Sequence, residues 1–290
     1  MTSTSLQVSI PGRTQSVLRV GALALALAFP LLGQAQGSAA APAAAAPAAN
    51  APATEYVPNV GQSGKDVVWV PTPQTVVDKM LELAKITPQD RLMDLGSGDG
   101  RTVITAAQRG LTAKGIEYNP EMAELARRNA AKAGVSERAT FETADLFKTD
   151  LSQADVITMF LLPSINEKLR PTILDLEPGT RIVSNTFRMG DWAPDVSETV
   201  TQDCSNYCTA LLWIVPAKVG GKWMLDGQTL ELQQSYQQLS GRLGDKPISD
   251  ARVDGKRIRF TVDGAQYEGE VDGKRMAGKN GSASWSARRG

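Results

Sequence analysis

A glycine-rich segment that follows an apolar strand is the feature that most constrains the fold of this chain. The segment reads Leu92-Met93-Asp94-Leu95-Gly96-Ser97-Gly98-Asp99-Gly100-Arg101-Thr102, with three alternating glycines. Glycine has no Cβ, so backbone amides can approach a ligand closely, and the start of the next helix presents unpaired N–H groups to a negative group. The sequence therefore predicts a strand, a cofactor-binding turn and a helix, in that order.

The spacing of the glycines separates this turn from other nucleotide-binding turns. A dinucleotide-binding turn has the pattern G-x-G-x-x-G. Here an acid stands two residues before the first glycine, which gives D-x-G-x-G-x-G over residues 94–100. This pattern resembles motif I of the class I S-adenosylmethionine (SAM) methyltransferases.

Apolar runs and helical stripes alternate around this motif and predict an α/β fold. Strands are expected at 91–95, 113–117, 140–143, 154–162 and 181–186, with helices at 72–85, 102–108, 120–133 and 163–176. This alternation is typical of a doubly wound, mostly parallel, Rossmann-like sheet that binds ligands at the carboxyl ends of its strands. Residues 197–201 and 207–215 are expected to form a hairpin that completes the sheet. An antiparallel last strand is also a feature of class I methyltransferases, so the resemblance covers about residues 67–216.

The C-terminal part carries a different repeat. Val253-Asp254-Gly255 recurs nine residues later at 262–264 and again at 271–273. Asp-Gly between alternating strands is a strong hairpin signal, so residues 219–290 are predicted to form an antiparallel β-meander, small and barrel-like. A calcium loop is disfavoured because the intervening positions lack oxygen ligands at alternate places.

The N-terminal part has the composition of an export signal followed by a spacer. Arg13 and Arg19 precede an apolar run at 20–32 and a small-x-small site at 33–35. The predicted divisions are an export signal at 1–35, an Ala/Pro-rich linker at 36–65, a SAM-binding domain at 66–218 and the meander at 219–290. An exported, periplasmic or envelope-associated protein is expected. It would have no stable membrane span if the signal is cleaved, and an uncleaved anchor is the alternative.

Composition removes several kinds of chemistry. The chain has no histidine, which excludes His-assisted nucleophiles and disfavours a metal site. Its 31 basic and 31 acidic residues cancel, which gives no electrostatic case for a nucleic-acid partner. Its two cysteines, Cys204 and Cys208, could bridge in an exported chain or remain free thiols.

The resemblance to class I methyltransferases implies a role for three acids at strand ends. Asp94 would bind the amino group of the methionine part of SAM, Glu117 the ribose hydroxyls, and Asp145 the adenine amine. Each role needs a hydrogen-bond acceptor, which a carboxylate provides. The implied cofactor-binding residues are Asp94, Gly96, Ser97, Gly98, Gly100, Glu117, Tyr118, Asp145 and Leu146.

Shorter matches narrow the resemblance to one group of methyltransferases. They are Trp69-Val70-Pro71-Thr72-Pro73, Phe160-Leu161-Leu162-Pro163, Asn185-Thr186-Phe187 and Asp191-Trp192. These segments resemble the lysine N-methyltransferases of the ATP synthase c subunit and of the adenine nucleotide translocase. The resemblance implies a protein lysine as the methyl acceptor.

Substrate chemistry agrees in part with a lysine acceptor. Enzymes that methylate bases or amides often carry an Asn/Asp-Pro-Pro-aromatic motif, and this chain has Leu161-Leu162-Pro163-Ser164 in its place. A lysine amine must lose a proton, and an apolar mouth favours that loss. Phe160 and Trp192 are the candidates for such a mouth, with a core role as the alternative for each. The sequence identifies no general base.

An export signal conflicts with a cofactor that is made in the cytoplasm. SAM could reach the other compartment, the signal could leave an anchored protein facing inward, or the fold could persist as a binding module. The alternatives to a lysine methyltransferase are therefore a non-catalytic exported envelope protein with a SAM- or nucleoside-binding fold, and a small-molecule methyltransferase. The sequence leaves the oligomeric state open.

Overall fold

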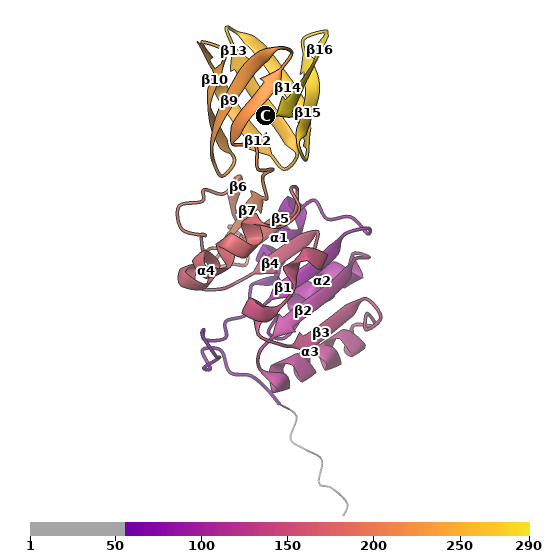
Figure 1. The fold of residues 1–290 in the computed structure, drawn as a ribbon. Helices are drawn as coiled ribbons and strands as arrows, with labels where there is room; N and C mark the ends of the chain where they lie inside the picture. The colour runs from indigo at the N-terminus through magenta and orange to yellow at the C-terminus, as the bar shows by residue number, and fades with distance from the viewer. Residues whose placement is uncertain (1–55) are drawn as a thin grey trace, which may run out of the picture. The chain divides into compact units, whose positions relative to one another are not determined.

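The computed structural model describes residues 56–290, and the predicted export signal at 1–35 and most of the linker lie outside them. A seven-stranded sheet forms the centre of the first part of the fold, in the order β3-β2-β1-β4-β5-β7-β6 (Figure 1). Its strands are β1 (Arg91–Leu95), β2 (Thr112–Glu117), β3 (Ala139–Thr143), β4 (Val156–Met159), β5 (Arg181–Asn185), β6 (Val196–Thr199) and β7 (Thr209–Ile214).

The pairing directions explain where a ligand can bind. β1 pairs in parallel with β2 on one side and with β4 on the other, and β7 pairs antiparallel with β5. The chain order therefore reverses at β1, and the connections from β1 and β4 leave the sheet in opposite directions. A crevice at the carboxyl ends of the strands is expected at such a switch point.

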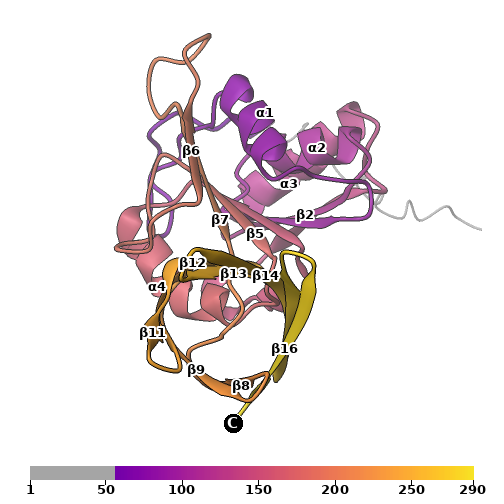
Figure 2. The same ribbon diagram turned by 90° about the horizontal axis from the view of Figure 1, so that it is seen from above.

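Helices cover both faces of the sheet. α1 (Gln74–Leu83), α2 (Arg101–Gln108) and α3 (Pro120–Lys132) pack on one face, and α4 (Pro163–Leu174) lies on the other (Figure 2). Each face has its own cluster of buried apolar side chains, as a sheet covered on both faces requires. No helix within residues 56–290 is long and apolar enough to cross a membrane.

The fourth strand is shorter than the sequence predicts. The apolar run at 154–162 is expected to be one strand, but β4 ends at Met159, and α4 begins at Pro163. Proline fits the first turn of a helix, where its missing N–H is not needed. Residues 160–162 therefore leave the sheet above its carboxyl end.

The C-terminal strands form a closed barrel, where the sequence predicts an antiparallel meander that is small and barrel-like. They are β8 (Gly221–Leu225), β9 (Gln228–Ser235), β10 (Gln238–Leu243), β11 (Lys246–Pro247), β12 (Ser249–Asp254), β13 (Arg257–Val262), β14 (Ala265–Asp272), β15 (Arg275–Asn280) and β16 (Ala283–Arg289). β9 pairs with both β8 and β10, and β16 pairs with β8, so the ring has no open edge (Figure 2). Closure satisfies the strand edges that a meander would expose.

Inward-facing side chains fill this barrel. Trp223, Phe260 and Trp285 are each at most 4% exposed and belong to one apolar cluster. The repeated valines at 253, 262 and 271 also point inward. Alternation along each strand thus gives one buried and one solvated face, as the hairpin pattern predicts.

The hairpin turns follow the Asp-Gly repeat only in part. Asp263-Gly264 is itself the turn between β13 and β14, with φ of +49° and +79°. Asp254, by contrast, pairs with Arg257, so that Gly255 and Lys256 form the turn between β12 and β13. The shift places Lys256 in the turn, with its side chain exposed, instead of opposite the inward-facing Val253.

Trp192 joins the barrel to the α/β part. Its indole stacks on Tyr236, with ring centroids 5.7 Å apart, and its Nε1 donates to Gln237 Oε1 at 2.8 Å. Gln237 Nε2 in turn donates to the backbone oxygen of Ala193 at 2.8 Å. Because Trp192 and Gln237 are both buried, neither side chain can replace these bonds with water.

Gln237→Ala is expected to lower the free energy of unfolding by about 1–3 kcal/mol, because it leaves the indole N–H of Trp192 buried without a partner. Gln238 is the exposed neighbour of Gln237 at the start of β10. Gln238→Ala is therefore the matched control and should change stability by less than about 0.5 kcal/mol. Urea unfolding followed by tryptophan fluorescence measures both values, and equal losses would contradict this role for Gln237.

Candidate functional site

The glycine turn forms the floor of a pocket at the carboxyl end of β1. The amides of Gly96 and Ser97 donate to the backbone oxygen of Ile116 at 2.9 and 3.1 Å, which ties the turn to β2. Gly98 has φ of +53°, and a Cβ there would lie 2.7 Å from the indole nitrogen of Trp69. The close approach of Trp69 therefore requires glycine at this position.

Gly100 closes the same turn. It is the N-cap of α2 with φ of +84°, and a Cβ would lie 2.7 Å from the ring of Phe141. The absence of a side chain allows α2 to start close to the sheet.

Asp94 is a buried acid at the end of β1. It is 6% exposed, and Thr158 on the adjacent strand donates to its Oδ1 at 2.6 Å. Burial raises the pKa of Asp94 to about 7, and the negative charges of Glu117 and Asp99 add to that rise. Within residues 56–290 no cation pairs with it, so the site is suited to receive a positively charged group.

Glu117 is oriented by backbone amides from two turns. Gly98 N donates to its Oε2, and Asn119 N donates to its Oε1, both at 2.9 Å. Asn119 also caps α3, since its Oδ1 accepts from the amide of Glu121. The carboxylate therefore has a fixed position at the end of β2, with further lone pairs for a ligand.

Asp145 lies beyond β3 and is paired with a residue from the N-terminal segment. Its Oδ1 accepts from the amide of Phe147, and Lys65 Nζ donates to its Oδ2 at 2.9 Å. The hydrogen bond from Lys65 lowers the pKa of the Asp145 carboxyl. Lys65 Nζ also lies 4.5 Å from the centroid of the Tyr118 ring. A cation thus joins two of the predicted cofactor-binding residues, Asp145 and Tyr118.

Lys65 belongs to a strap formed by residues 61–71. Gly61 N donates to the backbone oxygen of Trp69, and Trp69 N donates to that of Gln62, so the segment folds back on itself. The strap lines the pocket, although the sequence suggests a linker as far as residue 65. Nothing in its composition indicates that Lys65 contacts Asp145.

These residues converge on one cavity of about 520 Å³. Of the predicted cofactor-binding residues, the following line it: Asp94, Gly96, Ser97, Gly98, Glu117, Tyr118, Asp145 and Leu146. Gly100 belongs to the same turn, as the N-cap of α2, but it does not line the cavity. The hydroxyl of Ser97 is buried and has no hydrogen-bond partner within the described part of the chain. An unpartnered polar atom in a cavity is a natural contact for a ligand.

Three aromatic rings form one wall of the cavity. Phe160 follows β4, Phe187 follows β5, and Tyr207 precedes β7, so that three separate connections contribute one ring each. Phe160 lies 5.9 Å from Phe187 and 5.2 Å from Tyr207, centroid to centroid. We call this set the aromatic mouth. Phe160 is a sequence-predicted member, Phe187 falls in a segment that carries the resemblance, and Tyr207 has no sequence signal beyond its place between two cysteines.

The structure does not bring Trp192 to the aromatic mouth. Its side chain is fully buried between Trp213 and Tyr236, at the junction with the barrel. Trp192 is close in sequence to the Asn185-Thr186-Phe187 segment, which suggests that it lines the pocket. The chain turns away after Phe187, however, and Trp192 becomes a core residue.

Comparison with known proteins agrees with this geometry. The family model of the ANTKMT methyltransferase domain matches residues 94–196. The protein-lysine N-methyltransferase of Saccharolobus islandicus is 41% identical over 163 residues, which are 55% of this chain and 96% of that protein. The adenine nucleotide translocase lysine N-methyltransferase of Mus musculus is 36% identical over 140 residues, 48% of this chain and 56% of that protein. The Homo sapiens lysine N-methyltransferase of the ATP synthase c subunit is 33% identical, over 44% of this chain and 54% of its own length.

A solved structure is also similar. It is titled as an RNA methyltransferase from Salinibacter ruber in complex with S-adenosyl-L-homocysteine, and it is 47% identical. It covers 52% of this chain and 96% of its own, with a TM-score of 0.48. This chain spans about half the length of the Mus musculus and Homo sapiens relatives, whereas it spans almost the whole of the Saccharolobus protein.

The α/β sheet, the glycine turn and the strand-end acids define a SAM-dependent methyltransferase. The chain belongs to the family that contains the Saccharolobus protein and the animal enzymes named for the ATP synthase c subunit and the adenine nucleotide translocase. Its cofactor is SAM, and the pocket fits that group. A buried, unpaired Asp94 suits the amino group, the unpartnered hydroxyl of Ser97 offers a further polar contact, and the glycines leave the floor open.

The affinity for SAM should rise with pH between 5.5 and 7. In this range an α-amino group stays protonated, while Asp94, with a pKa of about 7, is mainly neutral in the free protein and must lose its proton to pair with that amine. The rise should approach tenfold per pH unit in the acidic part of the range. Isothermal calorimetry measures it, and buffers of different ionisation enthalpy report the released proton.

Asp94→Asn is the control for this pH dependence. It should weaken SAM binding at pH 7 and remove the slope, because the amide does not titrate. If the affinity of Asp94→Asn for SAM still rises with pH, the pH dependence belongs to another group.

Proposed function

We propose that this chain transfers a methyl group from SAM to the side-chain amine of a lysine in a protein. The observation that carries the proposal is the 41% identity over 96% of the length of a relative named as a protein-lysine N-methyltransferase. The aromatic mouth supports it, because an amine that enters an apolar site loses its proton more readily than in water.

The residues around the mouth suit two requirements of amine methylation. The first is deprotonation, since the free amine has a pKa of about 10.4. Leu161, which is 3% exposed, and the rings of Phe160 and Phe187 supply the desolvating wall. The second is alignment with the methyl group, and side chains fixed at strand ends hold an acceptor in one orientation. When bound, SAM supplies a methyl group activated by its positively charged sulfur.

A protein acceptor is favoured over RNA by the charge of the chain. Equal numbers of acidic and basic residues give no general attraction to phosphates. Since one similar structure is titled as an RNA methyltransferase, the test must distinguish the two classes of acceptor directly.

The expected acceptor class is tested with radiolabelled SAM and an extract of cells that lack the protein. Label should enter protein, resist nuclease and be lost with protease, and mass spectrometry should place it on lysine. Asp94→Asn should reduce incorporation at least tenfold at pH 7, because it loses the charge that pairs with the cofactor amine. Asp263→Asn changes an exposed turn acid of the barrel and should incorporate normally.

Label found in RNA, or only in small solvent-soluble molecules, would contradict the lysine proposal. Neither result would affect the assignment of SAM as cofactor, because calorimetry with purified protein measures that separately.

We also propose that the folded part acts outside the cytoplasm. The predicted export signal supports this location, and so does the disulfide between Cys204 and Cys208, because such bonds persist in oxidising compartments. Amino-terminal sequencing of the protein from fractionated cells should find it in the envelope, beginning near residue 36. A full-length protein in the cytoplasm with reduced cysteines would contradict this location.

A further inference from the structure

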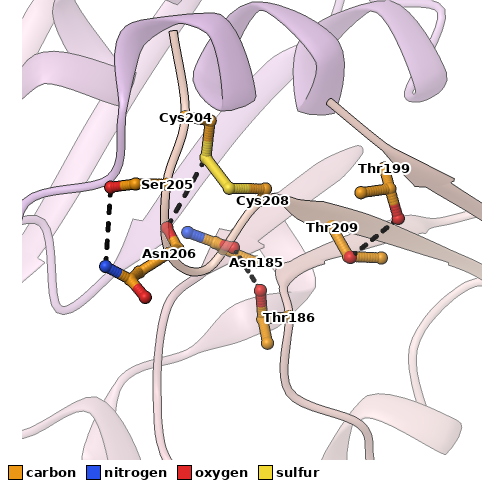
Figure 3. Close-up of a disulfide and its surroundings, with 8 residues drawn as sticks. All are labelled: Asn185, Thr186, Thr199, Cys204, Ser205, Asn206, Cys208 and Thr209. Carbon is orange, nitrogen blue, oxygen red and sulfur yellow. Dashed lines mark hydrogen bonds between the residues drawn. A yellow bond between two sulfur atoms is a disulfide. The ribbon is translucent and has the colours of Figure 1, made fainter. Parts of the chain in front are cut away.

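The connection between β6 and β7 is a cross-linked loop that reaches the pocket. It covers residues 200–208, and Cys204 and Cys208 within it form a disulfide (Figure 3). At the base of the loop Val200 N donates to the backbone oxygen of Cys208, and the hydroxyls of Thr199 and Thr209 lie 3.0 Å apart. Backbone pairing and a covalent bond therefore both restrict the loop.

Tyr207 is held in an unfavourable backbone conformation by this loop. Its φ is +58°, in the left-handed region, and Asp203, which precedes Cys204 in the same loop, has φ of +50°. Bulky residues rarely adopt this region, and they persist there when the surroundings fix them. The adjacent disulfide supplies that restraint, and the result is that the ring of Tyr207 joins the aromatic mouth.

The contacts of Tyr207 leave part of its ring available. One side packs on Phe160 and Phe187, with centroids 5.2 and 5.8 Å away, yet the residue remains 42% exposed and lines the cavity. Its hydroxyl makes no hydrogen bond to any group within residues 56–290. The side chain is thus positioned by packing, and it offers its aromatic surface to a ligand.

The geometry points to Tyr207 as the residue that recognises the acceptor amine, with the Cys204–Cys208 disulfide as the device that positions it. This inference rests on the proposed function. A lysine arrives as an ammonium ion and leaves as a methylated ammonium ion, and the face of a tyrosine ring attracts such cations within about 6 Å. Phe160 and Phe187 pack against the ring and fix its orientation.

The cation specificity is tested by NMR titration of the full chain with saturating S-adenosylhomocysteine. The probes are Nα-acetyl-Nε-trimethyllysine amide and its neutral isostere, in which a quaternary carbon replaces the nitrogen. The wild-type protein should bind the cation about three- to thirtyfold more tightly. Equal binding of the two probes would overturn the inference.

Substitutions at Tyr207 distinguish the contribution of its aromatic face to cation binding from the contribution of its apolar volume. Tyr207→Phe keeps an aromatic face and should retain the preference for the cation. Tyr207→Leu keeps an apolar side chain without that face, so the preference should fall to near one. Affinity for S-adenosylhomocysteine should remain within twofold in both variants, which shows that the fold and the cofactor site are intact. A full preference in Tyr207→Leu would overturn the role of Tyr207.

The positioning role of the disulfide is tested by replacing both cysteines with serine. The double variant Cys204→Ser/Cys208→Ser should bind the cation at least threefold more weakly, with cofactor affinity unchanged, because the loop no longer holds Tyr207 in place. Ser205→Ala changes the same loop without breaking the bond and should behave as the wild type. Unchanged cation binding in the double variant would overturn the positioning role.

Failure of the proposed function gives a different result from failure of this inference. If no protein lysine is labelled but the cation is still preferred in a Tyr207-dependent way, recognition of an amine by Tyr207 is supported and the lysine acceptor is excluded. If lysine is labelled but neither probe is preferred, recognition by Tyr207 is excluded and the lysine activity remains.

Discussion

The buried carboxyl of Asp94 is the constraint on which the site depends. It lies one residue before the end of β1, the strand at which the strand order of the sheet reverses, is 6% exposed, and accepts a hydrogen bond from Thr158. Burying an acid without a cation is costly, and the fold responds by raising its pKa to about 7. The cost is offset when a cation binds. The same residue therefore destabilises the free protein slightly and gives the pocket its preference for an amino group.

The other cofactor residues are arranged around this acid by backbone geometry. Gly98 donates its amide to Glu117, so the glycine turn orients the acid of the neighbouring strand. Trp69 packs where a side chain on Gly98 would stand, which ties the strap to the turn. Lys65 of the strap then pairs with Asp145, the acid of the third strand. A ligand whose amine binds Asp145 must compete with Lys65, so the strap and the cofactor are linked through one carboxylate.

The sequence predicts those parts of the fold and of the cofactor site that a local pattern of residues determines. The glycine spacing and the strand-end acids predicted a cluster that the structure brings together, because the carboxyl ends of parallel strands share one edge. The sequence does not predict features that depend on contacts between residues far apart in the chain. Trp192 is a core residue because Tyr236 and Gln237, more than forty residues away, cover it. The closure of the barrel depends on β9 pairing with two strands, which no single hairpin signal contains.

The aromatic mouth shows why acceptor recognition is harder to predict than cofactor binding. Cofactor residues follow one strand after another, whereas Phe160, Phe187 and Tyr207 come from three connections with no common spacing. The chain has no histidine that could act as a general base, so desolvation and orientation of the acceptor amine must take its place. Both depend on how rigidly the connections are held. The barrel junction fixes the connection after Phe187 through Trp192, and the disulfide fixes the one before β7, so elements outside the sheet determine the shape of the mouth.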